Sequence, residues 1–451
     1  SGFVSFDRIA AMLLCRCCCE RVYMGAKIQI IFRFSIPNAY FFVPLHQKTT
    51  MRTEGQYQGP TTGKQRHVVL DALRGLALAG IALANFPEFA LWTFLSDAEQ
   101  AAMPTAAIDK MVRYLQYVFI DGKFYTIFSL LFGIGFSLIL SRHPMSLFMR
   151  RMLILAGIGF LHLMFIWNGD ILLLYAVAGL LLPLFFHLKD RTQLWMATLL
   201  ILLPIALDAM TEFGGVDFAR PFYDAWWTQA TSQGITEENF AIWLRDADTY
   251  PQMFAFLTQG AIERMWEFVS GHRLPKVLGL FILGSQIGKH RLYARLPELP
   301  LRTWFRNSLL LALPTSLLYG WSATHSHPWG LTVHSLLYAV SVIPMATTYI
   351  TGFCMLIGHS KPLTFLAYPG RMALTNYISQ SLIGILLFYG IGFGMGTSFG
   401  LVYVELTAIA VFLLQIILSS LWLHYFRFGP LEWLWRMLTY GQYFKLRLPQ
   451  P

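Results

Sequence analysis

The chain has 451 residues, of which 56% are hydrophobic and only 13% are charged, and its net charge is +10 at pH 7. This much apolar surface exceeds what one water-soluble domain can bury, which excludes an ordinary soluble enzyme and indicates that lipid covers part of the chain. The positive charge does not indicate nucleic-acid binding, because the basic residues lie mostly at the ends of apolar runs, as membrane topology requires.

The first 50 residues differ from those that follow. Four of the five cysteines lie between residues 15 and 19, in a spacing that fits neither a disulfide framework nor a zinc site. We expect residues 1–50 to be a non-native or disordered extension and residues 51–67 to be a cytoplasmic tail. No metal and no bound cofactor are expected.

Ten apolar runs are long enough, at about 20 residues each, to cross a membrane. Five are expected within residues 68–209 and five within residues 272–424, and the basic residues at their ends place both ends of the membrane domain in the cytoplasm. The predicted fold is an all-α polytopic bundle in the inner membrane of a bacterium, with the lipid bilayer as its partner. The runs are 68–91, 115–140, 147–167, 171–188, 193–209, 272–288, 304–322, 331–357, 372–393 and 401–424.

Two segments outside the runs are predicted to lie at the membrane surface. Residues 210–271 are rich in tryptophan and carboxylates, which indicates amphipathic helices on the outer face. Residues 425–451 are expected to form an interfacial helix and a tail, with Glu432 and Arg436 spaced for an i, i+4 pair.

Polar residues within the first two runs are candidates for function, because burying them in a membrane is costly. Asp71 and Arg74 are one turn apart, and Asn85 returns to within about 20° of the same helix face. The alternative is an Asp–Arg pair that anchors the helix. Asp121 and Lys123 are predicted near the outer surface at the start of the second span.

The third run places Arg150 and Arg151 at its inner end and His162 near its outer end, followed by a turn that contains Asn168 and Asp170. Histidine exchanges a proton near neutral pH, and Asp121 or Asp170 would orient His162 as a base. The alternative is a core histidine satisfied by a neighbouring helix.

Further candidates lie in the second half of the chain. His272 and Arg273 precede the sixth run on the outer side, and Arg371 and Asn376 belong to a polar face at the start of the ninth. Such a face lines a cavity or clamps helices. Three histidines near residue 330 are interpreted as part of an interfacial loop in preference to a metal site.

Five segments in chain order, LDALRG, DGKFYTIFSLLFGIGF, LHLMFIWNGDILLLYA, GRMALTNYISQS and GPLEWLWR, resemble the YeiB-like family of bacterial membrane proteins, which is a domain of unknown function. The resemblance covers about residues 66–445 and implies a fold and a location more than an activity.

The LDALRG opening is also similar to that of membrane acyltransferases of the heparan-glucosaminide acetyltransferase type. The resemblance implies transfer of an acyl group from cytoplasmic acyl-CoA to an acceptor on the far side. The heparan-type enzymes have Asn at the position of Asn85 and an acetyl-accepting His a little further on. This chain has no His between Asn85 and Arg142.

Three functions follow as hypotheses. In the first, a transmembrane acyltransferase, Arg74, Arg150 and Arg151 hold the acyl-CoA co-substrate, and His162 deprotonates a small-molecule or glycan acceptor on the outer face. The second is a proton-coupled transporter of small molecules. The third is a structural or sensory protein that binds a partner through residues 210–271.

Overall fold

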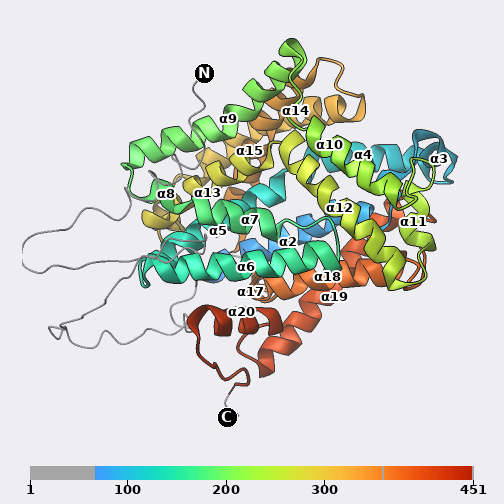
Figure 1. Cartoon of the computed structure of the whole chain (residues 1–451). Helices are drawn as coiled ribbons and strands as arrows, with labels where there is room; N and C mark the ends of the chain where they lie inside the picture. Colours follow the sequence, from blue (N-terminus) through green and yellow to red (C-terminus); the bar gives the residue numbers. More distant parts are fainter. Residues whose placement is uncertain (1–66, 358–359, 449–451) are drawn as a thin grey trace, which may run out of the picture. The chain divides into compact units, whose positions relative to one another are not determined.

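The computed structural model describes residues 67–357 and 360–448. The expected extension at residues 1–50, and the expected tail except for His67, lie outside the described residues. Within them the chain is helical, with one isolated bridge between Phe426 and Arg447 and no strand (Figure 1). The predicted all-α polytopic bundle is confirmed.

Longer and shorter helices follow one another along the described part of the chain. The longer ones are α2 (Val68–Phe89), α4 (Ala106–Phe119), α5 (Lys123–Leu140), α6 (Met145–Phe165), α7 (Leu172–Leu181), α9 (Asp190–Gly214), α10 (Arg220–Ser232), α12 (Tyr250–Ser270), α13 (Arg273–Lys289), α14 (Leu301–Thr324), α15 (Leu331–Ile357), α18 (Ala373–Phe388), α19 (Leu401–Tyr425) and α20 (Pro430–Tyr440). The shorter ones are α3 (Asp97–Ala102), α8 (Pro183–Phe186), α11 (Phe240–Asp246), α16 (Lys361–Thr364) and α17 (Ala367–Arg371).

Each of the ten expected spans contains a helix, and six helical stretches are long and apolar enough to cross a membrane. The number of ten spans and the inward orientation of both ends stay predictions. The six stretches are Val68–Phe89, Ala106–Leu140, Met145–Phe165, Asp190–Gly214, Leu331–Ile357 and Leu401–Tyr425. Large apolar side chains point outward from them, for example Trp195, Leu199 and Leu418, as expected of a surface in contact with lipid.

The expected second span differs from the observed helices. The sequence predicts one helix from residue 115, whereas α4 ends at Phe119 and α5 begins at Lys123. Gly122 between them has a φ of +76°, a left-handed conformation that glycine adopts at little cost. The break turns Asp121 and the start of α5 toward the interior of the bundle.

Glycines allow the helices of the interior to cross closely. A Cβ at Gly133 of α5 would lie 2.2 Å from the carbonyl oxygen of Phe281, and one at Gly284 of α13 would lie 2.1 Å from that of Leu130. The two glycines therefore set the α5–α13 contact, as small residues do between membrane helices. Gly75 fills the same role in α2, where a Cβ would lie 1.9 Å from the carbonyl oxygen of Leu366.

The segment expected on the outer face forms α10, α11 and α12. α12 also packs against α6 and α13, and it buries Gln259, Glu263 and Arg264. Its inner face is thus part of the bundle, while Trp226 and Trp266 stack between α10 and α12 with ring centroids 5.3 Å apart.

The C-terminal helix α20 contacts α6 and α18 (Figure 1). Its Glu432 carboxylate accepts hydrogen bonds from the backbone N–H groups of Leu374 and Thr375, at 2.7 and 3.0 Å, and from the hydroxyl of Thr375 at 2.6 Å. Glu432 therefore caps the N-terminus of α18, where a helix leaves its first N–H groups without intrahelical partners.

Candidate functional site

A cavity of about 440 Å³ lies among α2, α5, α9, α12, α13, α14 and α15, at the end of the bundle that the predicted orientation places outside. Ionisable and aromatic polar side chains from separate helices converge on it, a combination expected of a binding site and not of a packing defect. They are Glu88, Asp121, Tyr125, Asp208, Arg264, His272, Arg273, Lys276, Tyr319, His327, His334, Tyr338 and Tyr377.

A histidine–aspartate pair forms one wall of the cavity. His272 precedes α13 in a left-handed conformation with a φ of +46°, and its Nε2 lies 2.9 Å from Oδ1 of Asp208 on α9. The hydroxyl of Ser335 on α15 donates to Oδ2 of the same carboxylate. Asp208 is thereby held by two other helices.

This arrangement assigns a role to each ring nitrogen of His272. An ionised carboxylate only accepts hydrogen bonds, so Nε2 carries the proton and Nδ1 is left with the lone pair. Nδ1 has no hydrogen-bond partner among the described residues, and His272 lines the cavity. A neutral imidazole oriented in this way is suited to accept a proton from a molecule in the cavity.

Asp121 and Lys123 lie at the break between α4 and α5. The hydroxyl of Tyr319 donates to Oδ2 of Asp121 at 2.5 Å. Lys123 is fully buried, donates to the carbonyl oxygen of Tyr117 at 2.5 Å and lies 4.8 Å from the centroid of the Tyr319 ring. Asp121 lines the cavity and Lys123 supports the wall behind it.

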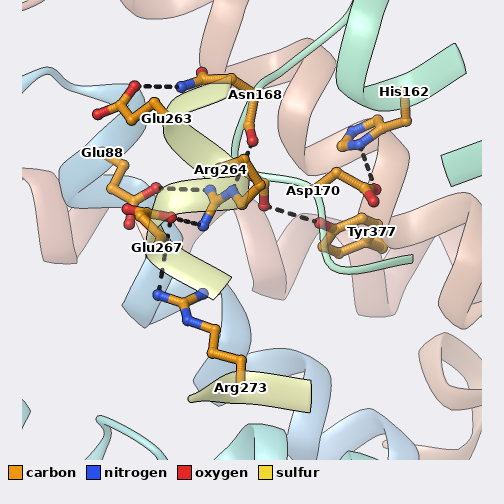
Figure 2. Close-up of polar contacts among 10 residues, drawn as sticks. Glu88, His162, Asn168, Asp170, Glu263, Arg264, Glu267, Arg273 and Tyr377 are labelled. Atoms are coloured by element: carbon orange, nitrogen blue, oxygen red, sulfur yellow. Dashed lines mark hydrogen bonds and ion pairs between the residues drawn. The ribbon is translucent and has the colours of Figure 1, made fainter. Parts of the chain in front are cut away.

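The inner face of α12 contributes a chain of ionic contacts that sequence reasoning missed (Figure 2). The guanidinium of Arg264 donates from Nε to the carbonyl oxygen of Asn168 at 2.7 Å and contacts both Glu267 and Glu88, the latter at 3.7 Å. Glu267 also lies 3.9 Å from Arg273. These contacts link α2, α12 and α13.

Glu263 precedes Arg264 on α12, and its carboxylate accepts a hydrogen bond from the Asn168 side chain at 3.3 Å (Figure 2). Burial raises the pKa of Glu263 well above its usual value, and the neighbouring Glu267 carboxylate raises that pKa further. The tryptophans and carboxylates of residues 210–271 had indicated amphipathic helices on the outer face. The spacing of Glu263 and Glu267 at i, i+4 was the available signal that they share one face.

His162 lies apart from the cavity, in a buried cluster with Asp170 and Ser381. Its Nδ1 is 2.9 Å from Oδ1 of Asp170 and its Nε2 is 3.0 Å from the hydroxyl of Ser381, while Asp170 also accepts from the backbone N–H of Leu173 at 2.7 Å. Serine, histidine and aspartate in this order resemble a hydrolytic triad. However, all three are buried and none lines the cavity.

Tyr377 lies against both the cluster and the cavity. Its ring centroid is 5.4 Å from that of His162, its hydroxyl donates to the carbonyl oxygen of Gly169 at 3.5 Å, and both Tyr377 and Gly169 line the cavity (Figure 2). Of the two carboxylates considered for His162, the structure places Asp170 beside it. The catalytic role of His162 stays a prediction.

The residues expected to hold acyl-CoA do not form one group. Asn85 lines the cavity, whereas Asp71 and Arg74 form an ion pair of 2.7 Å near the start of α2. The guanidinium of Arg151 lies 3.6 Å from the centroid of the Trp435 ring. Arg150 is exposed beside it, at the end of the bundle predicted to face the cytoplasm.

The polar face of α18 clamps helices together. The Asn376 amide donates to the carbonyl oxygen of Pro369 at 3.3 Å and to the hydroxyl of Ser419 on α19 at 2.9 Å. Arg371 donates to the carbonyl oxygen of Arg427 at 3.4 Å. Neither Arg371 nor Asn376 lines the cavity, so of the two alternatives for this face the geometry favours packing.

Comparison with known proteins gives a family but no activity. Residues 294–442 match a family described as "Protein of unknown function (DUF418)". The chain is 28% identical over 414 residues to the uncharacterised protein YxaH of Bacillus subtilis (strain 168), and the aligned region covers 84% of this chain and 96% of YxaH. It is 29% identical over 403 residues to the uncharacterised protein YeiB of Escherichia coli (strain K12), and the aligned region covers 83% of this chain and 96% of YeiB.

The resemblance to the YeiB-like family is confirmed. The chain is also 29% identical over 399 residues to an uncharacterised 39.9 kDa protein of Bacillus acidopullulyticus, which covers 86% of this chain and 98% of that protein. No solved structure matches the chain significantly. With six helical stretches long and apolar enough to cross a membrane, the chain is a multi-pass membrane protein.

Proposed function

We propose that this protein is an acyltransferase of the bacterial inner membrane, and that the cavity holds the acceptor at the outer face. The observation that carries the proposal is the His272–Asp208 pair, in which the carboxylate orients the imidazole of a residue that lines the cavity, and the second ring nitrogen has no hydrogen-bond partner among the described residues. This pair replaces His162 as the candidate base, because His162 has both ring nitrogens bonded within the buried cluster.

The acyl donor in the proposed reaction is a thioester. The acceptor hydroxyl or amine gives its proton to Nδ1 of His272 while its oxygen or nitrogen attacks the thioester carbonyl. The carbon–sulfur bond then breaks, and the leaving thiolate takes the proton from the imidazolium. Asp208 stays ionised and stabilises the imidazolium. The Asn85 amide lines the same cavity and would donate to the developing oxyanion.

The donor enters from the opposite side in this proposal. Arg150 and Arg151 lie together at the predicted inner end of α6, and Arg151 stacks on Trp435. Guanidinium groups bind phosphates well, so this end would hold the nucleotide of acyl-CoA while the acyl arm extends into the bundle toward His272.

The test is release of free thiol from acetyl-CoA and longer acyl-CoAs by the purified protein, with a panel of sugars and amines as acceptors. We expect His272→Ala to lower the rate at least about 100-fold, which is the lower range for loss of a general base. His290→Ala is the matched control, because His290 lies 3.3 Å from Asp190 in an exposed pair outside the cavity.

Two results would remove the transferase proposal. One is the absence of thiol release with every donor and acceptor in the panel, together with no thermal stabilisation by acyl-CoA. The other is an equal loss of rate in His272→Ala and His290→Ala. Loss of rate in His162→Ala with an unaffected His272→Ala would return the role of base to the buried cluster.

A proton-coupled transporter is the second candidate, and the carboxylates of α2 and α12 favour it. Glu88 and Glu263 are joined through Arg264 and Asn168 beside the cavity, and buried carboxylates are common in proton relays of transporters. Substrate-dependent proton flux in proteoliposomes that is lost in Glu88→Gln would support this candidate. Thiol release without flux would count against it.

A further inference from the structure

The first turn of α13 brings two cationic side chains, Arg273 and Lys276, to the wall of the cavity. They are three residues apart, so they lie on the same face of the helix. Both are half-buried, and a charge removed from bulk water in this way is costly unless a partner compensates it.

Neither cation has a close partner among the described residues. Lys276 makes no hydrogen bond and no ion pair there, and its ammonium lies 4.3 Å from the centroid of the Tyr338 ring. Arg273 makes no hydrogen bond, and its one ion pair, to Glu267, spans 3.9 Å. Glu267 is at the same time the closer partner of Arg264.

The carboxylates of the cavity are already engaged. Asp208 accepts from His272 and Ser335 through its two oxygens. Asp121 accepts from the Tyr319 hydroxyl, and Glu88 lies 3.7 Å from Arg264. Each of these three carboxylates therefore has a hydrogen-bonding or ionic partner among the described residues, whereas Lys276 lies only against the Tyr338 ring.

The position of the two cations adds to this preference. They lie in the first turn of a 17-residue helix, and the N-terminus of a helix carries a partial positive charge that favours anions. The Tyr338 ring beside Lys276 supplies an apolar wall, so a bound molecule would be anionic at α13 and less polar toward Tyr338.

We infer that Arg273 and Lys276 bind the anionic group, a carboxylate or a phosphate, of the molecule that occupies the cavity. This inference rests on the proposed function, because it names the chemical class of the acceptor held beside His272. The anionic group belongs either to a soluble small molecule or to the headgroup of a lipid.

The test is equilibrium binding of radiolabelled inorganic phosphate to the full chain in nanodiscs of zwitterionic phosphatidylcholine. We expect one saturable site per chain, displaced by acetate, with an affinity at least tenfold weaker in Lys276→Met and in Arg273→Gln. Arg306→Gln is the control, since Arg306 is an exposed cation of α14 and its loss changes the net charge equally. Lys276→Arg keeps the charge and is expected to keep binding.

Nanodiscs in which phosphatidylglycerol replaces part of the phosphatidylcholine separate the two sources. A weaker apparent affinity for phosphate would identify a lipid headgroup as the ligand, and an unchanged affinity would identify a soluble anion. Absence of saturable binding of both phosphate and acetate to the wild type would overturn the inference, as would an equal loss in Arg306→Gln.

The thiol-release assay on the same preparations keeps the two proposals separate. Phosphate binding that needs Lys276, without any acyl transfer, would leave the anion site standing and remove the transferase. Acyl transfer that needs His272 but is unchanged in Lys276→Met, without phosphate binding, would remove the anion site alone.

Discussion

Replacing Gly133 by alanine is expected to disturb both stability and the cavity. The new Cβ would lie 2.2 Å from the carbonyl oxygen of Phe281 and 2.8 Å from the backbone nitrogen of Ser285. Carbon and oxygen approach to about 3.3 Å without strain, so α5 and α13 would have to separate by about 1 Å. Both neighbours are backbone atoms, which a change of side-chain rotamer does not relieve.

The cost of this overpacking is about 1–3 kcal/mol, against a gain of about 1 kcal/mol when alanine replaces glycine within a helix. The net effect of Gly133→Ala is therefore a lower Tm. Because α13 begins just after His272 and carries Lys276, we also expect weaker phosphate binding and slower thiol release in this variant.

Gly135 offers a matched control on the same helix, since a Cβ there meets no atom within 4 Å. Gly135→Ala is expected to keep or raise the Tm and to leave the cavity unchanged. The measurement is thermal unfolding of both variants in one detergent. Equal Tm values for Gly133→Ala and Gly135→Ala would show that the close α5–α13 crossing does not exist and would refute the reasoning.

Three further predictions concern polar groups that join helices or lie within the bundle. Because the pKa of Glu263 is raised in the folded protein, the folded state holds a proton that the unfolded state releases. The free energy of unfolding therefore falls as pH rises above the usual glutamate range, by at most about 1.4 kcal/mol per pH unit. A Glu263→Gln variant should show a flatter dependence of Tm on pH, and an unchanged slope would contradict the assignment. Glu432→Ala removes the cap of α18 and should cost at least about 0.5–2 kcal/mol, measured as a lower Tm than that of the exposed-site variant Glu298→Ala. Lys123→Met removes a buried hydrogen bond to the carbonyl oxygen of Tyr117, which leaves that oxygen unpaired at a cost of about 1–3 kcal/mol; a Tm equal to that of the wild type would show that the bond contributes nothing.

Local features of the sequence were enough to predict the helices. Every expected span contains a helix because an apolar run of about 20 residues satisfies its own backbone hydrogen bonds and needs no information from the rest of the chain. The break after Phe119 was not predicted. A single Gly122 inside an apolar run does not by itself distinguish a left-handed turn from a tolerated helical glycine.

Distance along the chain explains which site residues could be predicted. Asp170 is 8 residues from His162, so that pair was visible in one segment, whereas Asp208 is 64 residues from His272 and 127 residues from Ser335. A contact between distant segments depends on which helices pack together, and periodicity does not specify that. Sequence reasoning therefore favoured His162 as the base and left Asp121 and Asp170 open as its partner.

The two histidine–aspartate pairs use the same hydrogen bond in different surroundings, and that contrast favours His272 as the base in the proposed reaction. In the buried cluster the second ring nitrogen of His162 meets Ser381, so the imidazole joins α6, α18 and the turn between α6 and α7. At α13 the second nitrogen of His272 has no hydrogen-bond partner among the described residues, and His272 lines the cavity beside Arg273 and Lys276, neither of which has a carboxylate oxygen closer than 3.9 Å there. A base needs a reachable proton, and an anionic acceptor held by Lys276 and Arg273 would bring its hydroxyl or amine to this wall. Proton transfer and substrate recognition would then both depend on the first turn of α13.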